Sequence, residues 1–259
     1  MDKRKIGVVI DCFRLGVRAG IEKVVELGLD GFQVYVTKGE MDPDNMSPSK
    51  RREFVKFISD YGLDISALCG DMGYGFFDPA TKDYMVTRTK QFIDLAVDLG
   101  TKIITSHTGL VPEDPNDQRR LMGIEAMKDV LEYAESRDVF FANETGLEPP
   151  ERLLALLKDL DNPAMKVNYD PANLVMRGYD HIGGVEVLRN YIVHTHAKDG
   201  IRREGHDQEV PLGEGSVNFP LYLAALDRIA YSGYLTIERE SGEDPVKDIA
   251  KAISFLRSL

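Results

Sequence analysis

The sequence predicts one α/β domain spanning residues 1–259, folded as a closed (β/α)8 barrel. Three observations predict this fold. Eight short, strand-like runs alternate with helical patterns, glycines recur just before several of these runs, and a chain of 259 residues has the usual length of such a barrel. An open doubly wound sheet is the alternative, but no glycine-rich phosphate-binding fingerprint follows the first run.

The strand candidates follow one another at regular intervals and are rich in branched and aromatic residues. They cover residues 6–10, 31–36, 64–68, 102–105, 139–142, 165–168, 191–194 and 234–237. Because a helical pattern separates each run from the next, we expect parallel strands joined by right-handed crossovers.

Helix boundaries are marked by specific residues. Ser47 followed by Pro48 predicts an N-cap with proline at the first helical position, and the helical pattern continues to Tyr61 and Gly62. Four glycines immediately before strand candidates are each predicted to end a helix in the left-handed conformation: Gly28, Gly62, Gly100 and Gly233.

Composition excludes several classes of protein. The chain carries 32 Lys and Arg against 43 Asp and Glu, a net charge of −11, which disfavours binding to nucleic acid or anionic membranes. No stretch approaches the roughly 20 apolar residues of a membrane span. Two cysteines are too few for a disulfide scaffold. The basic N-terminus leads into a short apolar run without a cleavage site, so we expect no signal peptide and a cytoplasmic enzyme.

Ionisable residues finish four consecutive strand candidates. Glu144, Asp170, His196 and Glu238 follow the fifth, sixth, seventh and eighth runs at comparable depth. The loops after the strands converge at one end of a barrel, so these side chains are expected to meet there. Three converging carboxylates would repel one another, and a divalent cation removes that conflict. Three oxygen donors and one imidazole favour Mn²⁺ or Mg²⁺, with Co²⁺ and Zn²⁺ as further options.

These motifs resemble the xylose-isomerase-like TIM-barrel superfamily of sugar isomerases and epimerases. The resemblance covers the chain in segment order and is carried by Asn-Glu-Thr-Gly at 143–146, Asp-Pro-Ala-Asn at 170–173, His-Ala-Lys-Asp at 196–199, Pro-Leu-Gly-Glu-Gly at 211–215 and Ile-Glu-Arg-Glu at 237–240. It implies that Glu144, Asp170, His196 and Glu238 hold one Mn²⁺-type ion, and that the two glutamates exchange protons with a substrate whose enediolate the metal stabilises. The resemblance also implies a dimer or tetramer.

Further residues are candidates for substrate contact. Arg202 matches an arginine that contacts substrate oxygens in the epimerase branch, and with Lys198 and Arg203 it forms a positive cluster in the sequence. His107, after the fourth run, is expected to line the pocket or orient a metal ligand, with a structural role as the alternative. Asn173 stands where the epimerase branch has a histidine; its amide can bind a sugar oxygen but cannot shuttle a proton.

Departures from the family pattern leave the substrate open. Asn173, and Thr145-Gly146 after Glu144, depart from the ketohexose 3-epimerases, so a different keto-sugar, sugar phosphate, cyclitol or glycoside derivative is expected. A lyase or dehydratase using the same site, and a sugar-binding protein without catalysis, are the alternatives. Nuclease activity is not expected, because the extra histidine ligands of the repair-endonuclease branch are missing.

Overall fold

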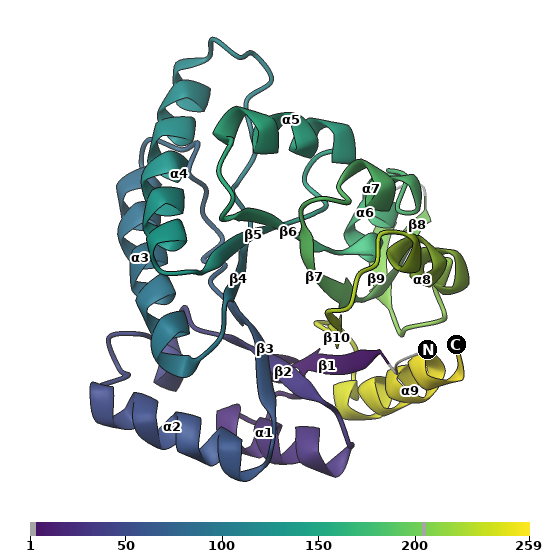
Figure 1. Cartoon of the computed structure of the whole chain (residues 1–259). Coiled ribbons are helices and arrows are strands. Elements are labelled where there is room, and N and C mark those ends of the chain that lie inside the picture. Colours follow the sequence, from purple (N-terminus) through teal and green to yellow (C-terminus); the bar gives the residue numbers. More distant parts are fainter. Residues whose placement is uncertain (1–3, 204–205) are drawn as a thin grey trace.

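Eight parallel strands close into a barrel, as the sequence predicts. The computed structural model describes residues 4–203 and 206–259, so residues 1–3 of the basic N-terminal run lie outside the described part. The barrel strands are β1 (Lys5–Val9), β2 (Gly31–Tyr35), β3 (Asp64–Cys69), β4 (Ile103–Ser106), β5 (Phe140–Glu144), β6 (Met165–Tyr169), β7 (Ile192–Ala197) and β10 (Tyr234–Ile237). The first and last of them pair, which closes the ring (Figure 1).

Helices cover the outside of the barrel (Figure 1). They are α1 (Val17–Glu26), α2 (Pro48–Asp60), α3 (Lys82–Leu99), α4 (Gln118–Ser136), α5 (Pro150–Leu160), α6 (Pro171–Arg177), α7 (Gly183–Val187), α8 (Phe219–Arg228) and α9 (Pro245–Ser258), with short 3-10 turns η1 (Ile10–Phe13) and η2 (Gly39–Met41). The core lies between strands and helices. Phe32, Val34 and Phe141 are at most 1 % exposed there, and burying such a side chain stabilises the fold by about 1.5–3 kcal/mol.

Alternation along the strands separates this apolar core from a polar barrel interior. In β7, His194 and His196 lie two residues apart and therefore on the same face, and both are about 1 % exposed. His194 contacts Asn168 on β6 and Thr236 on β10, at 2.8 and 2.9 Å. It is thus an interior, hydrogen-bonded histidine. Side chains that point inward from neighbouring strands therefore contact one another inside the barrel.

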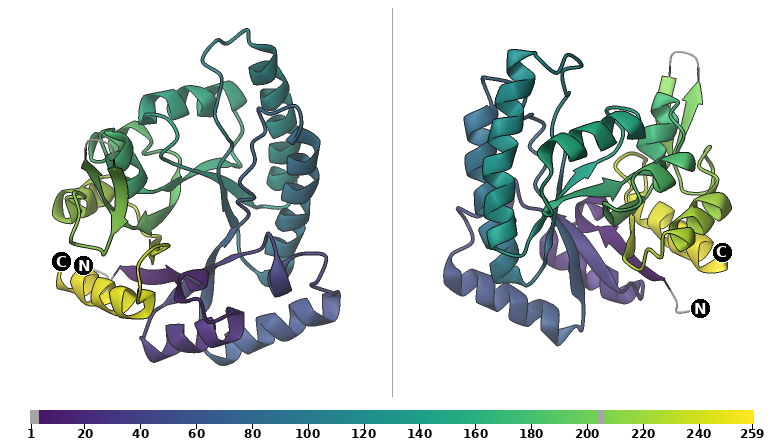
Figure 2. Two further views of the ribbon diagram at one scale, coloured as in Figure 1. Left: turned by 180° about the vertical axis from the view of Figure 1, so that it is seen from behind. Right: turned by 45° about the horizontal axis from the view of Figure 1, so that its top comes forward.

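A hairpin after β7 was not predicted from the sequence. Strands β8 (Asp199–Arg203) and β9 (His206–Val210) form this antiparallel pair. Figure 2 shows this hairpin projecting from the barrel wall. Asp199 anchors its base: the buried carboxylate accepts four backbone N–H groups, those of Gly200, Gly213, Gly215 and Val217, at 2.8–3.0 Å.

The helix boundaries follow the predictions with one exception. Ser47 caps α2, and Gly28, Gly62 and Gly100 have φ of 64°, 66° and 76°. The prediction for Gly233 is wrong. Helix α8 ends at Arg228, so the left-handed position falls on Ala230, with φ 55°. Gly233 is small for another reason: a Cβ there would lie 2.4 Å from the Tyr231 hydroxyl.

No helix in the described ranges has the length and apolar character that crossing a membrane requires.

Candidate metal centre and active-site cavity

The four residues singled out at the strand ends come from adjacent strands on one side of the barrel. The strands lie in the order β10, β7, β6, β5, and each carries one of the four residues within its last two positions or immediately after it. Each side chain extends an inward-facing row: Glu144 follows Ala142, Asp170 follows Asn168, His196 follows His194 and Glu238 follows Thr236. Alternation along the strands therefore directs all four into the interior.

Their polar atoms converge on one point. One donor atom from each of Glu144, Asp170, His196 and Glu238 lies within 4.8 Å of the other three. His196 Nδ1 is 3.3 Å from Glu238 Oε2, 3.5 Å from Asp170 Oδ2 and 3.6 Å from Glu144 Oε1. All four side chains are buried. We call this group the metal-site cluster.

Two buried atoms in the metal-site cluster lack hydrogen bonds. Asp170 Oδ2 and His196 Nδ1 have no hydrogen-bond partner within the described residues. The other Asp170 oxygen accepts the N–H groups of Ala172 and Asn173 at the start of α6, at 2.8 and 2.9 Å. A buried polar atom without a partner costs about 1–3 kcal/mol. A cation bound by both atoms would offset that cost, so the residues present fit a divalent metal.

The proton on His196 is placed by a neighbouring amide. Gln33 donates its Nε2 to Thr105 Oγ1 at 2.9 Å, so its Oε1 is the atom that faces His196 Nε2, at 3.0 Å. With Nε2–H of His196 donating to this oxygen, Nδ1 is the ring nitrogen that faces the three carboxylates and is available to a metal. Metal-binding histidines are commonly fixed in this way.

The charges of the metal-site cluster perturb its titration. Burial lowers the pKa of His196, but the carboxylates of Glu238 and Glu144 outweigh burial and raise it well above the usual value. Burial raises the pKa of Glu238, and the charges of His196 and Lys198 outweigh it and hold that pKa well below its usual range. The raised pKa of His196 reflects the carboxylates around it, and the lowered pKa of Glu238 reflects the positive groups beside it.

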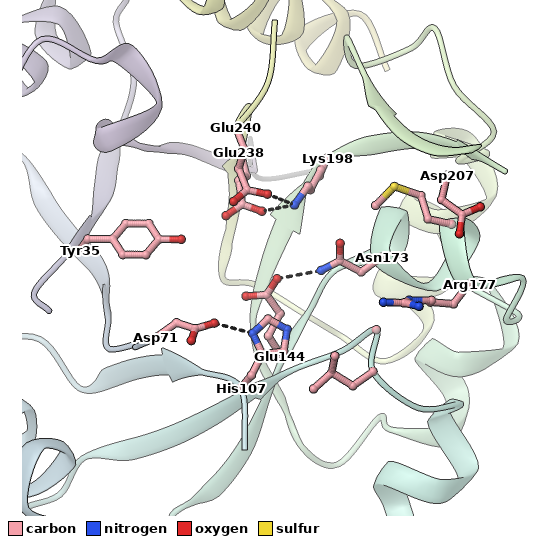
Figure 3. Close-up of a pocket in the computed structure, with 13 residues that line it drawn as sticks. Tyr35, Asp71, His107, Glu144, Asn173, Arg177, Lys198, Asp207, Glu238 and Glu240 are labelled. Carbon is pink, nitrogen blue, oxygen red and sulfur yellow. Dashed lines mark hydrogen bonds and ion pairs between the residues drawn. The ribbon is translucent and has the colours of Figure 1, made fainter. Parts of the chain in front are cut away.

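Polar side chains hold both glutamates in place. Asn173 Nδ2 donates to Glu144 Oε1 at 2.9 Å, and Asn168 Nδ2 donates to Glu144 Oε2 at 3.2 Å. Lys198 Nζ lies 2.9 Å from Glu238 Oε2 and 2.6 Å from Glu240 Oε2. Figure 3 shows Lys198, which follows the neighbouring strand β7, directed at both glutamates. From the sequence we grouped Lys198 with Arg202 and Arg203; in the structure Lys198 is 4 % exposed and paired with carboxylates.

A cavity of about 380 Å³ opens above the metal-site cluster. His107 lines it, with its Nδ1 2.6 Å from Asp71 Oδ2. Burial lowers the pKa of His107, but the charge of Glu144 and the bond to Asp71 outweigh burial and raise it to about 9. Asn173 and Lys198 also line the cavity.

Arg202 lies elsewhere. It is exposed on the hairpin and donates Nη1 to the carbonyl of Arg177 at 2.9 Å, and it is not among the residues that line the cavity. Arg177 itself lines the cavity, and Figure 3 shows its guanidinium directed inward.

Sequence reasoning missed several residues of this site. Asn168 and Gln33 each stand as a polar residue inside a strand of buried residues, and that signal was available from the sequence. Tyr35 ends β2, Asp71 lies in the loop after β3 and Arg177 ends α6. They gave no such signal, because only the closed barrel brings these segments to the cavity.

The comparison with known families agrees with the fold and with the strand-end motifs. The family described as xylose isomerase-like TIM barrel matches residues 21–259. This chain belongs to that family.

Similar proteins include a sugar epimerase and solved structures with the same barrel. L-ribulose-5-phosphate 3-epimerase UlaE of Escherichia coli is 25 % identical over 245 residues, covering 90 % of this chain and 86 % of the relative. The crystal structure of a xylose isomerase domain protein from Planctomyces limnophilus has a TM-score of 0.88 at 26 % identity, covering 100 % of this chain and 97 % of that one. A D-tagatose 3-epimerase-like protein has a TM-score of 0.80 at 21 % identity, covering 98 % of both chains.

Proposed function

We propose that this protein is a divalent-metal-dependent sugar isomerase or epimerase, in which Glu144 and Glu238 exchange a proton with the carbon next to a carbonyl group. The observation that carries the proposal is the metal-site cluster: four buried donor atoms within 4.8 Å of one another, at the base of a cavity large enough for a sugar. The sugar epimerase among the relatives supports the same class of reaction.

The ion would be held by Glu144, Asp170, His196 and Glu238. When bound, a divalent cation would supply Lewis-acid stabilisation of the negative charge that develops on the substrate oxygens. The donor set of three carboxylates and one imidazole favours Mn²⁺, with Mg²⁺, Co²⁺ and Zn²⁺ as alternatives. Metal content of the purified protein, measured by elemental analysis, tests this choice.

The two glutamates approach the reacting carbon from different directions. Glu144 ends β5 and Glu238 follows β10, and two barrel strands separate them. One glutamate, in its ionised form, takes the proton from one face, and the other, which carries its own proton at that point, delivers that proton to the opposite face, which inverts the carbon; exchange of protons with water restores both groups. Return of the proton to the neighbouring carbon gives aldose–ketose isomerisation instead. A positioned acid or base contributes about 10²–10⁴-fold to the rate.

The surrounding side chains prepare these carboxylates for proton transfer. Lys198 pairs with Glu238 and favours its ionised form, which is the form that accepts a proton. The amides of Asn168 and Asn173 fix the orientation of Glu144. Both glutamates are less than 10 % exposed, so bulk water has little access to them.

Hydrogen exchange tests the proposal directly. The metal-loaded protein is incubated in D₂O with pooled ketoses and ketose phosphates, and incorporation of deuterium at carbon is followed by NMR. We expect incorporation with at least one substrate and a loss of 10²-fold or more in the Glu144→Gln and Glu238→Gln variants. The matched control is Glu240→Gln, which also contacts Lys198 but lies outside the metal-site cluster; it should lose less than tenfold.

The outcomes separate the alternative functions. Tight sugar binding without deuterium incorporation would contradict catalysis and favour a sugar-binding protein. A product that has lost water would identify a lyase or dehydratase. Near-normal turnover by either glutamine variant would remove that glutamate from proton transfer. Contact of Arg202 with substrate, a cytoplasmic location and a dimer or tetramer stay predictions from the sequence.

A further inference from the structure

A second hollow adjoins the cavity above the metal-site cluster. It has a volume of about 440 Å³ and shares Asp71, His107 and Leu147 with the cavity as lining residues. Its own walls include Tyr74 and Leu110. The two spaces are therefore neighbours, with the His107–Asp71 pair at the boundary between them. We call the second space the Tyr74–Leu110 hollow.

Two crossing loops build the floor of this hollow. The loop after β3 and the loop after β4 touch at Gly75 and Gly109, where a Cβ on Gly109 would lie only 2.6 Å from the Gly75 Cα. A hydrogen bond from Phe76 N–H to the Thr108 carbonyl, at 2.9 Å, joins the same loops. Because this contact is between backbones, the floor is already formed before any ligand enters.

The walls offer apolar and aromatic surface that is open to solvent. Leu110 is 71 % exposed and Tyr74 is 52 % exposed, with its ring packed edge-on against Tyr84. Ligand sites in proteins combine such surface with a few polar groups. Here the polar groups are the Asp71–His107 pair and Asp78. The carbon-bound hydrogens of a sugar ring and its hydroxyl groups match this combination.

The charges around the Tyr74–Leu110 hollow disfavour an anionic ligand there. Its described lining residues include Asp71 and Asp78 but no lysine or arginine, and its one histidine, His107, is paired with Asp71. Two like charges 8 Å apart repel by about 2 kcal/mol at an effective dielectric constant of 20. A phosphate dianion would therefore be repelled more strongly than an uncharged ring.

We propose that the substrate is an uncharged keto-sugar that carries a second ring, a keto-glycoside. Its carbonyl end lies over the metal-site cluster and its second ring occupies the Tyr74–Leu110 hollow. This inference rests on the proposed isomerase or epimerase function and adds the substrate class to it. It also separates this chain from its relative that acts on a pentulose phosphate.

Three ketoses that differ at one position provide the test. D-fructose, D-fructose 6-phosphate and isomaltulose share the same carbonyl and neighbouring carbons, and carry on O6 a hydrogen, a phosphate and a glucose ring. Deuterium incorporation in D₂O is measured for each with the metal-loaded protein. We expect kcat/KM for isomaltulose to exceed that for fructose at least tenfold, and fructose 6-phosphate to be the poorest of the three.

Variants of the hollow locate the second ring. Tyr74→Ala and Leu110→Ala should each lower kcat/KM for isomaltulose five- to tenfold and change that for fructose less than twofold. The control is Leu221→Ala, an exposed leucine on α8 outside the hollow, which should alter neither.

Several results would overturn the inference. Faster exchange of fructose 6-phosphate than of isomaltulose would refute the substrate class and leave the proposed function standing. Equal losses for fructose and isomaltulose in Tyr74→Ala would refute the placement of the second ring. A change of oligomeric state in Tyr74→Ala, seen by sedimentation, would identify the hollow as a subunit contact. Exchange with none of the three ketoses would contradict the proposed function together with this inference.

Discussion

Replacement of Asp199 by asparagine should destabilise the protein strongly although it changes little in size. The Asp199 side chain is buried, and each of its oxygens accepts two backbone N–H groups. Gly200 and Val217 bind Oδ1, and Gly213 and Gly215 bind Oδ2. Asparagine offers one oxygen only, so its NH₂ group must face one of these pairs.

The size of the effect follows from counting these bonds. Two buried N–H groups left without an acceptor cost about 2–6 kcal/mol in free energy of unfolding. The two bonds that keep an oxygen lose the assistance of the negative charge, about 1 kcal/mol each. Local opening of the segment after the hairpin limits the total, because it exposes the unpaired groups to water. We therefore expect Asp199→Asn to lower the free energy of unfolding by about 3–5 kcal/mol.

Urea denaturation measures this loss, and hydrogen exchange locates it. The amides of Gly213 and Gly215 should exchange at least 100-fold faster in the variant. The control is Asp207→Asn on the exposed face of the hairpin, which should change the free energy of unfolding by less than about 0.5 kcal/mol. A loss below about 1 kcal/mol for Asp199→Asn, with unchanged amide exchange, would refute the assignment of this carboxylate as the anchor of the hairpin base.

Three further predictions concern the metal, a buried cation and a loop crossing. Removing divalent metal with EDTA should lower the melting temperature, and Mn²⁺ at 100 times its Kd should restore about 2.7 kcal/mol of stability. Calorimetry measures both changes. An equal response of the Glu238→Gln variant to Mn²⁺ would argue against Glu238 as a metal ligand. Lys198→Met should destabilise the metal-free protein, but by less than the roughly 3–5 kcal/mol typical of breaking a buried ion pair, because one partner of this lysine, Glu240, is solvent-exposed. Urea denaturation measures the change in stability, and an increase would contradict the prediction. Gly109→Ala should lower the free energy of unfolding by at least about 2 kcal/mol, more than Gly16→Ala. Both glycines have positive φ, but of the two only Gly109 lies against another backbone, that of Gly75. Similar losses in the two variants would show that the two loops separate to accommodate the added methyl group.

Much of the fold was predictable because its determinants are local. Each strand is a short buried run, and the structure places all eight within a few residues of the predicted bounds. The β8–β9 hairpin was missed because its sequence, with Arg202 and Arg203 in one strand and Asp207 in the other, is polar on both faces and lacks a buried row. Gly233 was misinterpreted because proximity to a strand does not determine where the preceding helix ends.

In the candidate site, too, the residues set by local sequence were predictable and those set by tertiary packing were not. Glu144, Asp170, His196 and Glu238 were predictable as a group because strand ends converge in any such barrel. The pairing of Lys198 with two glutamates was not, since it depends on how far β10 and its following residues extend beside β7. Arg177 was equally hidden: it ends a short helix, and only the seating of that helix above β6 turns its guanidinium towards the cavity.

The inward rows that terminate in Glu144, Asp170, His196 and Glu238 have a consequence for protein engineering. Because the barrel wall itself supplies these side chains, the segments at its mouth can be exchanged between homologues without rebuilding the reactive centre. Grafting the β8–β9 hairpin or the loops that cross at Gly75 and Gly109 should then alter which molecules are accepted while the underlying chemistry persists.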